Sequence, residues 1–454
     1  MTQPMTQLRE PVVVVGLGLT GLACVRYLLR HGVTPTVTDS RTAPPGLDAL
    51  QREAAHVVAH CGELDRALLN QAGTVLVSPG VALSTPALVE AAAAGAELIG
   101  DIELFARQTE VPVVAITGSN GKSTVTTLVG EMARQAGLRV AVGGNLGRPA
   151  LELLDEPAEL YVLELSSFQL ETTCSLQPVA AAVLNLSPDH QDRYADMASY
   201  AAAKQRILRG AATAILNRDD PWVAAMADPK QATRWFTLGD PEGADLGVID
   251  VSGVAWLVAG EERLMQADEV ALSGQHNRAN ALAALAIGRA IGLPLAAMRQ
   301  VLGGFSGLPH RSRRVAEIDG VVWYNDSKGT NVGATLAAVA GIPGERIVLI
   351  AGGDGKGADF APLAGAVAER CRAVVLIGRD APRLQAALAE TVPLQRAETL
   401  KEAVQQAAEL ARPGDSVLLS PACASLDMFR DYADRGEQFE AAVNRLRREV
   451  NHVG

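Results

Sequence analysis

The segment that most constrains the fold of this chain is a glycine-containing loop between a predicted strand and a predicted helix. Residues 115–124 read Ala-Ile-Thr-Gly-Ser-Asn-Gly-Lys-Ser-Thr, and the predicted helix continues over residues 126–135. In such a loop, backbone N–H groups and the helix N-terminus face an anion, Lys122 adds positive charge and a hydroxyl can hold Mg²⁺. Ile116 stands where the general phosphate-loop pattern has its first glycine. We therefore predict a phosphate-binding loop in a parallel α/β domain, with an ordinary Ser/Thr-capped glycine turn as the alternative.

Length, charge and cysteine pattern limit the class of protein. At about 100 to 200 residues per domain, 454 residues form two to four domains. The formal net charge is −11 and no cationic block offsets it, so we expect no nucleic-acid partner. Five scattered cysteines without a C-x-x-C pair are typical of a reducing cytoplasm and give no zinc pattern. Glycines interrupt the apolar run 11–25, which is too short to span a bilayer, so we expect a cytoplasmic protein without membrane insertion.

Three α/β domains are predicted, because short runs of Val, Ile and Leu alternate with amphipathic stretches and this alternation restarts twice. We expect a Rossmann-like N-terminal domain over 1–100, a central P-loop-type ATPase domain with a mainly parallel sheet over 101–309, and a Rossmann-like C-terminal domain over 310–454. Residues 244–272 show no regular pattern, and a last helix is expected near 438–450. The predicted strands are 12–15, 34–38, 74–77, 111–117, 139–142, 160–165, 179–186, 321–324, 346–350, 373–377 and 416–419.

A second glycine motif lies near the N-terminus. Gly16, Gly18 and Gly21 form G-x-G-x-x-G between a predicted strand and helix, and Asp39 ends the next strand about 20 residues on, as in a dinucleotide fingerprint. The physics requires only that a nucleotide-like anion fits the turn. Ser-Pro-Gly at 78–80 ends another strand and offers further N–H groups and a hydroxyl. A tight turn without a ligand is the alternative.

Polar residues also follow successive strands of the predicted central domain. Asn145, Glu164 and the pair Asp189 and His190 stand at such strand ends. Because the carboxyl ends of parallel strands share one edge, we expect these side chains to converge on the phosphate loop. Glu164 could serve Mg²⁺ there, as acidic strand ends do in P-loop enzymes. By itself a glutamate in this place is more often a helix cap, and a lone histidine is more often structural.

Three loops of the third domain follow predicted strands in the same way. Residues 325–331 and 351–357 each present a cation and an acid in a glycine-containing backbone, which suits contacts with nucleotides or carboxylates. Residues 420–425 form the third loop, and together the loops predict one binding edge. Cys423 is expected to be a buried thiol rather than a nucleophile, because its motif lacks a histidine and Asp427 disfavours a thiolate.

Taken together, these motifs resemble the Mur ligases of peptidoglycan synthesis over essentially the whole chain. The resemblance implies a monomeric, ATP-dependent amide ligase that joins D-glutamate to UDP-N-acetylmuramoyl-L-alanine through an acyl phosphate, with two Mg²⁺ ions and small molecules as its only partners. The N-terminal glycine turn would then hold UDP rather than NAD. The resemblance rests on residues 118–124, 143–145, 164–170, 189–194, 274–277 with Asn280, 310–311, 325–331, 352–357 and 419–427.

The resemblance also implies roles for individual residues. The catalytic residues would be Lys122, His190, Lys204 and Glu164. The ATP-binding residues would be Gly118, Asn120, Gly121, Lys122, Ser123, Thr124, Asn277, Asn280, Arg311 and Asp326. The UDP-substrate residues would be Gly18, Leu19, Thr20, Asp39, Ser78, Pro79, Gly80, Asn145 and His190. The D-glutamate residues would be Lys328, Thr330, Lys356, Ser425 and Tyr432. The metal ligands would be Ser123, Glu164, His190 and, as a CO₂-derived carbamate, Lys204.

Three positions need comment. From the residues alone, Lys204 is expected to be a helix-surface lysine, whereas the resemblance implies a carbamylated lysine whose carbamate is an additional metal ligand. Gln191 stands where Met is common in the family, and Tyr432 stands where Phe is expected. The latter difference concerns the D-glutamate pocket.

Other functions remain open at this point. An NAD-dependent oxidoreductase would use the N-terminal glycine motif but leaves Lys122 and the third domain without a role. A non-catalytic ATP-binding switch would use the phosphate loop but not Glu164 or His190. Among ligases, a relative that adds L-alanine and a folylpolyglutamate synthase are the nearest competitors. The G-x-G-x-x-G domain argues against the folate enzyme.

Overall fold

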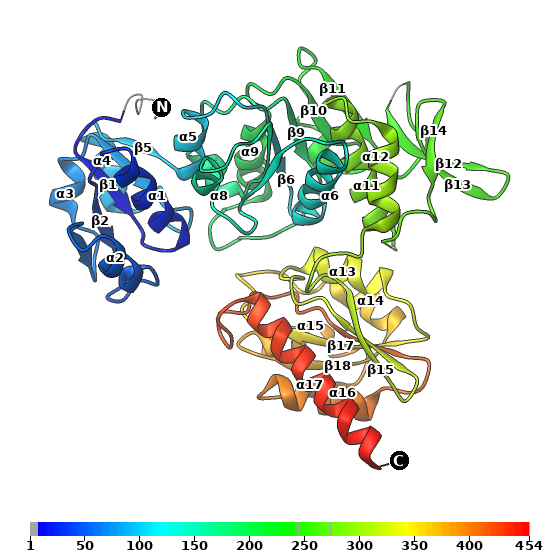
Figure 1. Cartoon of the computed structure of the whole chain (residues 1–454). Coiled ribbons are helices and arrows are strands. Elements are labelled where there is room, and N and C mark those ends of the chain that lie inside the picture. The colour runs from blue at the N-terminus through cyan, green and yellow to red at the C-terminus, as the bar shows by residue number, and fades with distance from the viewer. Residues whose placement is uncertain (1–7, 244, 273, 454) are drawn as a thin grey trace. The chain divides into compact units, whose positions relative to one another are not determined.

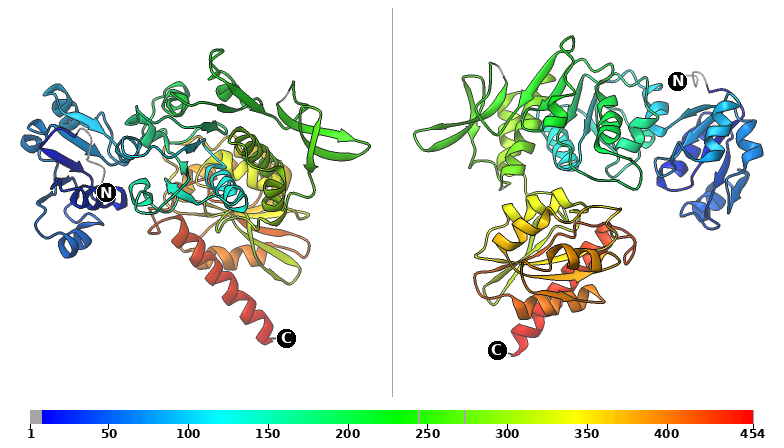
Figure 2. Two further views of the ribbon diagram at one scale, coloured as in Figure 1. Left: turned by 45° about the horizontal axis from the view of Figure 1, so that its top comes forward. Right: turned by 180° about the vertical axis from the view of Figure 1, so that it is seen from behind.

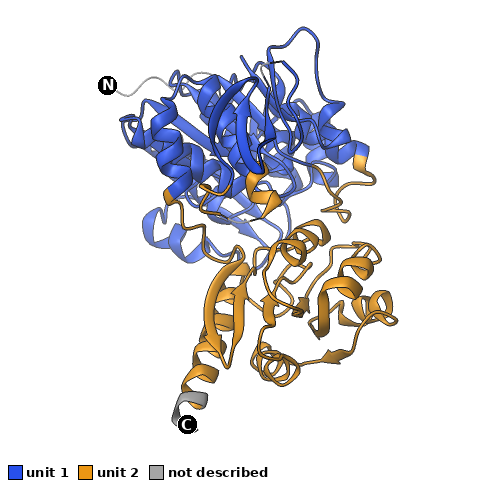
Figure 3. Cartoon of the chain, turned by 90° about the vertical axis from the view of Figure 1, so that its right-hand side faces the viewer, with its two compact units in different colours: residues 1–185, 198–267, 280–303 blue, residues 186–197, 268–279, 304–454 orange. Residues whose placement is uncertain are grey.

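The computed structural model of the chain contains three sheets, each flanked by helices (Figure 1). It describes residues 8–243, 245–272 and 274–453. The chain forms two compact units, the first comprising residues 1–185, 198–267 and 280–303 and the second residues 186–197, 268–279 and 304–454 (Figure 3). The first unit holds the first two sheets and the second unit holds the third.

The first sheet is parallel and has the strand order β3-β2-β1-β4-β5. Its central strand β1 is a run of four valines, all buried, as is typical of a strand covered on both faces. The chain reverses its direction of winding between β1 and β4, which creates a crevice at their carboxyl ends. The strands are β1 (Val12–Val15), β2 (Thr36–Asp39), β3 (Ala59–Cys61), β4 (Thr74–Val77) and β5 (Glu97–Ile99), and the helices are α1 (Leu19–Arg30), α2 (Leu47–Glu53), α3 (Arg66–Asn70) and α4 (Pro86–Ala93).

The second sheet has the order β14-β13-β12-β11-β10-β9-β6-β8-β7 and is parallel from β7 to β12. Its strands are β6 (Val113–Thr117), β7 (Val140–Gly144), β8 (Leu160–Glu164), β9 (Ala180–Val183), β10 (Ala214–Asn217), β11 (Thr233–Phe236), β12 (Leu246–Val251), β13 (Val254–Ala259) and β14 (Glu262–Gln266). Its helices are α5 (Asp101–Ala106), α6 (Lys122–Gln135), α7 (Ala150–Leu153), α8 (Ser167–Glu171), α9 (Met197–Gln205), η1 (Arg206–Leu208), α10 (Pro221–Ala224), α11 (Gln275–Ala290) and α12 (Leu295–Gly304).

The third sheet has the order β15-β16-β20-β17-β18-β19, and only β15 among these described strands runs antiparallel. Two apolar cores lie on its opposite faces, one under α13 to α15 and one under α16 and α17 (Figure 2). The strands are β15 (Arg313–Ile318), β16 (Val321–Asn325), β17 (Ile347–Gly352), β18 (Cys371–Ile377), β19 (Leu394–Arg396) and β20 (Ser416–Leu419). The helices are α13 (Val332–Gly341), α14 (Leu363–Arg370), α15 (Ala381–Leu388), α16 (Leu400–Leu410) and α17 (Tyr432–Val453).

All eleven predicted strands overlap strands of the structure, and the fold class is confirmed. The prediction over 179–186 was too long, because β9 ends at Val183 and the Asn185 carbonyl then accepts a hydrogen bond from the Ser119 N–H. Residues 246–266, which had no assignment, form the antiparallel strands β12 to β14, whose partly exposed faces gave no continuous apolar run. Within the described residues, no helix combines the length and apolarity that crossing a membrane requires.

Candidate active site

The carboxyl end of strand β6 carries the phosphate loop, and strand register brings Glu164 next to it. Ile116 on β6 is the partner of Glu164 on β8, and Glu164 is also the partner of Gly144 on β7. The buried Glu164 carboxylate accepts hydrogen bonds from Ser123 Oγ at 2.5 Å and from Asn145 Nδ2 at 2.6 Å. The structure thus brings together three of the polar residues predicted for this edge of the sheet.

The phosphate loop adopts a conformation that requires its glycines. Gly121 has φ +83°, and a Cβ atom there would lie 2.3 Å from Asn280 Oδ1. Asn280, which was predicted to bind ATP, therefore packs directly against the loop. Lys122 Nζ donates hydrogen bonds to the carbonyl oxygens of Gly118 at 2.8 Å and Ser119 at 2.9 Å. These two hydrogen bonds hold the Lys122 side chain against the backbone of the phosphate loop.

The expectation that Lys204 is a surface lysine is wrong, because its side chain is only 2% exposed. Its ammonium group donates to the Gly118 carbonyl at 2.9 Å and lies 4.8 Å from the centre of the Tyr200 ring, one helical turn earlier on α9. The sequence between these two residues is Ala-Ala-Ala, which offers little amphipathic contrast. Helix periodicity therefore could not show that this face of α9 is turned toward the phosphate loop.

The oxygen donors of the loop fit a magnesium ion. No group of three or more His, Cys, Asp or Glu side chains converges within the described residues. Mg²⁺, however, is commonly held by one or two carboxylates together with substrate phosphates and water. Ser123 Oγ and the Glu164 carboxylate supply such oxygen atoms beside the predicted phosphate site. Lys204 as an ammonium group is a donor and not a ligand, so it would join the metal site only as a carbamate.

A cavity of about 510 Å³ lies in the first unit between the strand-end turns of the first sheet and the turn that follows β7. It contains eight of the nine predicted UDP-substrate residues, and the ninth, His190, belongs to the second unit. Arg41 and Gln169 also line this cavity, although neither was predicted. The eight predicted residues are Gly18, Leu19, Thr20, Asp39, Ser78, Pro79, Gly80 and Asn145.

Two predicted residues in this cavity shape the glycine turn. Asp39 accepts hydrogen bonds from the N–H groups of Leu17 at 2.7 Å and Arg41 at 2.8 Å, and the Arg41 guanidinium binds both carboxylate oxygens. Burial opposes ionisation of Asp39, but these donors outweigh it and lower the pKa to about 2. Ser78 Oγ donates to the Gly16 carbonyl at 2.9 Å. Asp39 and Ser78 therefore hold the turn in addition to facing the cavity.

In the second unit, Asp189 contacts predicted residues of two loops, one after β16 and one after β17. Its carboxylate forms an ion pair with Lys356 and accepts a hydrogen bond from Asn331 Nδ2 at 3.1 Å. Burial raises the pKa of Asp189, but the charges of Lys356 and His190 outweigh this and lower it to about 2. His190 adopts a positive φ of 54° and its Nε2 lies 3.7 Å from Asp189 Oδ2.

Lys328 and Tyr432, both predicted to bind D-glutamate, lie against each other. Lys328 Nζ is 3.8 Å from the centre of the Tyr432 ring, so tyrosine retains the aromatic face of the expected phenylalanine. Sequence reasoning missed Arg435, which is fully buried and donates to Ser327 Oγ, the Ser327 carbonyl and the Cys423 carbonyl. Burial lowers its pKa to about 10. As one charged residue within an amphipathic helix, Arg435 left no signal in the sequence.

Of the remaining predicted residues of the second unit, Asp326, Thr330 and Ser425 lie on the strand-end loops expected for them. Asp326 accepts hydrogen bonds from the Ser312 N–H at 2.9 Å and Ser420 Oγ at 2.7 Å, and burial raises its pKa to about 6 while Arg311 opposes the rise. The Cys423 thiol is fully buried and its pKa is raised to about 12, which confirms the expected buried thiol. The others are Asn277 near the start of α11, Thr330 in the loop after β16 and the buried Ser425 after β20.

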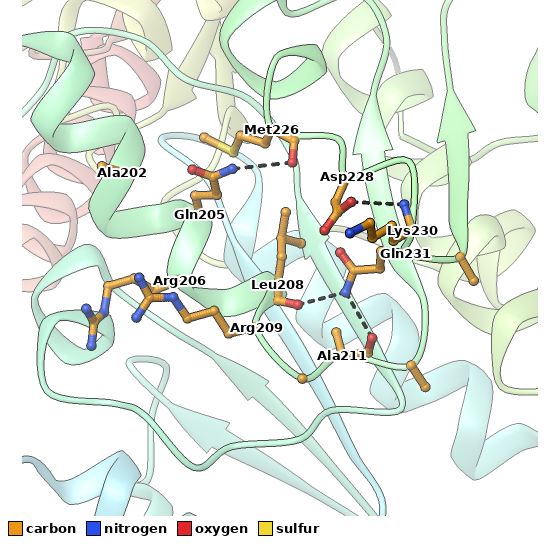
Figure 4. Close-up of a pocket in the computed structure, with 13 residues that line it drawn as sticks. Ala202, Gln205, Arg206, Leu208, Arg209, Ala211, Met226, Asp228, Lys230 and Gln231 are labelled. Atoms are coloured by element: carbon orange, nitrogen blue, oxygen red, sulfur yellow. Dashed lines mark hydrogen bonds between the residues drawn. The ribbon is translucent and has the colours of Figure 1, made fainter.

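A second cavity of the first unit, of about 590 Å³, contains none of the predicted residues (Figure 4). It lies beside the end of α9 and η1, where Gln231 Nε2 donates to the carbonyl oxygens of Leu208 and Ala211. The strand-end cavity is therefore the one to which sequence and geometry both point.

The fold and the site define a class of protein, and comparison with known proteins agrees. Residues 10–100 match the description "Mur ligase MurD-like, N-terminal domain", residues 116–288 match "Mur ligase middle domain", and residues 310–423 match "Mur ligase, glutamate ligase domain". The chain belongs to the Mur ligase family.

Within this family the chain is similar to UDP-N-acetylmuramoylalanine–D-glutamate ligases. It is 55% identical over 442 residues to that of Nitrosococcus oceani, which covers 97% of this chain and 98% of the relative. It is 54% identical over 437 residues to that of Pseudomonas aeruginosa, which covers 96% and 98%.

Solved structures of lower identity agree on the fold. The UDP-N-acetylmuramate-alanine ligase MurC of Thermotoga maritima superposes with a TM-score of 0.62 at 16% identity and covers 96% of this chain and 99% of that protein. A pseudomurein peptide ligase type C of Methanothermus fervidus gives a TM-score of 0.61 at 18% identity with the same coverage. At these identities the likeness concerns the three-domain architecture alone.

Proposed function

We propose that this chain joins D-glutamate to UDP-N-acetylmuramoyl-L-alanine in an ATP-dependent reaction of peptidoglycan precursor synthesis, acting as a cytoplasmic monomer. One observation carries the geometric argument: Asn145 lines the strand-end cavity and donates to Glu164, which in turn accepts from Ser123 of the phosphate loop. A nucleotide substrate in the cavity and ATP on the loop would therefore meet at Glu164. Transfer of a phosphoryl group from ATP to the substrate requires such a meeting point.

The chemistry follows from the substrates. A carboxylate is a poor electrophile, so the terminal alanine carboxylate of the nucleotide substrate first takes the γ-phosphoryl group of ATP and becomes an acyl phosphate. The amine of D-glutamate then attacks the acyl carbon, the amide bond forms and phosphate leaves. Bringing two anions together requires positive charge, which Lys122 and Arg311 would supply. Mg²⁺ held by Ser123 and Glu164 would supply further charge neutralisation on the phosphates.

Binding of each substrate is assigned to one group of residues. The loop residues Gly118 to Thr124, with Asn277, Asn280, Arg311 and Asp326, would bind ATP. The residues of the strand-end cavity, with His190, would bind the UDP moiety and its sugar. Lys328, Thr330, Lys356, Ser425 and Tyr432 would bind D-glutamate, whose two carboxylates need the two lysines. Because Lys356 is paired with Asp189 in this structure, a substrate carboxylate would have to compete with Asp189 for it.

We also propose that Lys204 carries a carbamate that helps to hold a second Mg²⁺ ion together with His190. The amine must be neutral to react with CO₂, and burial disfavours its charged form. We expect Lys204→Ala to be nearly inactive and to regain activity in part when acetate is added. Lys204→Arg should stay inactive with acetate, because it supplies charge of the wrong sign. Wild-type turnover in Lys204→Ala would reject the carbamate.

The overall assignment is tested by phosphate release from ATP. The assay combines UDP-N-acetylmuramoyl-L-alanine with a panel of D- and L-amino acids, and release should require both the nucleotide and D-glutamate. Equal rates with L-alanine or L-glutamate would contradict the assignment. Tight binding of NADH without ATP turnover would instead favour the oxidoreductase.

A further inference from the structure

The segment that joins the first two sheets contains two buried carboxylates that the proposed mechanism does not use. Asp101 and Glu103 lie on the short helix α5, and each is 2% exposed. Both bind the region of α8, which begins three residues after Glu164. Asp101 Oδ2 accepts from Gln169 Nε2 at 3.2 Å, whereas Glu103 Oε2 accepts from the N–H groups of Cys174 and Ser175 just beyond the helix. Asp101 thus binds a side chain of α8, whereas Glu103 binds the backbone that follows this helix.

Gln169 links Asp101 to the strand-end cavity. Gln169 is among the residues that line that cavity, and its Oε1 accepts from the Ser166 N–H at 3.1 Å in a capping box that starts α8. With Oε1 engaged by a backbone donor and Nε2 engaged by a carboxylate, the amide has one orientation. The Asp101 side chain accepts no other side-chain hydrogen bond in the described chain, and its Oδ1 has no partner. Gln169 is therefore the one side chain that donates a hydrogen bond to Asp101 among the described residues, while the backbone N–H groups of Asp101 and Ile102 also favour the charged carboxylate.

A carboxylate is costly in this place, which argues that its contact matters. Asp101 is fully buried, no cation pairs with it among the described residues, and burial raises its pKa to about 6. A leucine of similar size would avoid this cost, but it could not accept the hydrogen bond from Gln169. The backbone also approaches α8 closely, since a Cβ atom on Gly100 would lie 2.3 Å from Thr172 Oγ1. Asp101 is therefore held at a fixed distance from the cavity wall.

We infer that Asp101 is a positioning residue for the nucleotide substrate, acting through Gln169. It accepts one N–H of the Gln169 amide, fixes that amide in the wall of the strand-end cavity and so sets the affinity for the UDP substrate without touching ATP or D-glutamate. This inference rests on the proposed function, because it takes the cavity to be the UDP-substrate site.

The test uses steady-state kinetics of the full chain with each of the three substrates varied in turn. We expect Asp101→Ala to raise KM for UDP-N-acetylmuramoyl-L-alanine about tenfold or more, because a hydrogen bond to a charged group is lost. KM for ATP and for D-glutamate and kcat should change by less than about threefold. Asp101→Asn keeps an oxygen acceptor in the same place and should restore the nucleotide KM to near the wild-type value. Equal increases in all three KM values would overturn the inference.

Two further variants separate positioning from folding. Glu103→Gln removes the charge of the other buried carboxylate of α5, which does not bind Gln169. This variant should lower the melting temperature and leave KM for UDP-N-acetylmuramoyl-L-alanine unchanged. Gln169→Ala should reproduce the kinetic effect of Asp101→Ala, and the double variant should be no worse than either single one. Additive effects, or a nucleotide KM raised equally by Glu103→Gln, would show that Asp101 is merely structural. If the wild-type chain fails to ligate D-glutamate, the proposed function fails instead, and calorimetry with UDP-N-acetylmuramoyl-L-alanine still tests Asp101.

Discussion

Asp326→Asn should make the protein more stable at alkaline pH and less active. The Asp326 carboxyl group is buried, and burial raises its pKa to about 6 from an ordinary 3.8. The asparagine amide can take its place, because Oδ1 can accept from the Ser312 N–H and Nδ2 can donate to Ser420 Oγ. The Ser420 hydroxyl is then free to donate to Thr335 Oγ1, 3.1 Å away. No buried polar group is left without a partner.

The size and sign of the effect follow from the pKa. A difference of about two pKa units corresponds to about 3 kcal/mol. Between about pH 4 and pH 6 the folded protein binds more protons than the unfolded chain, so the free energy of unfolding falls as the pH rises through this window. Well below pH 3.8 both states are protonated and the penalty is absent, whereas well above pH 6 both states are ionised and the penalty is complete. Asparagine never ionises, so the variant should gain up to about 3 kcal/mol at pH 8 and less than about 1 kcal/mol at pH 4.

Thermal melting of wild type and variant at pH 8, 6 and 4.5 measures this effect. At about 2 to 4 °C per kcal/mol for a domain of this size, the C-terminal transition should rise by up to about 10 °C at pH 8 and by only about a third of this at pH 4.5. Asp101 also titrates near pH 6 but is present in both proteins, so its contribution cancels. A stabilisation that is independent of pH, or larger at pH 4.5, would refute the argument. Turnover should fall because Asp326 is proposed to bind ATP.

Four other predictions concern the proposed roles. Lys122→Ala should lower kcat about 10³-fold with the fold intact, and a folded variant with near-normal turnover in the phosphate-release assay would contradict the phosphate-loop role. Glu164→Gln should raise the Mg²⁺ concentration needed for half-maximal activity, and a magnesium titration identical to wild type would exclude Glu164 as a ligand. Asp39→Ala should weaken binding of the UDP substrate and leave ATP binding unchanged, which calorimetry with each ligand measures. An unchanged affinity for the UDP substrate would contradict the role of Asp39. Lys356→Ala should chiefly raise KM for D-glutamate, and kinetics that showed only an ATP defect would reassign it.

Much of the fold follows from the sequence because it is built from local signals. The four valines of β1 and the buried runs of β8 and β17 read as strands covered on both faces, and the positions of the glycine loops follow from the strand ends. The convergence of Glu164 with the phosphate loop could also be expected, since both stand at carboxyl ends of parallel strands. Half-exposed and edge strands such as β12 and β19 could not be predicted, because a strand with one solvent-exposed face lacks a continuous apolar run.

The tertiary structure decided what depends on contacts between segments distant in sequence. The sequence by itself determined which residue types stand at the strand ends and in the phosphate loop. Helix periodicity left Lys204 as a surface lysine, although the family resemblance implied a metal-binding carbamate there. The sequence gave no role to Arg435 or Gln169 and did not single out Asp101. Each of these side chains is buried by a segment at least twelve residues away, such as the phosphate loop around Lys204 or α8 beside Asp101. Helix periodicity reports only which face of a helix is apolar, and it carries no information on the partner that buries a charged side chain.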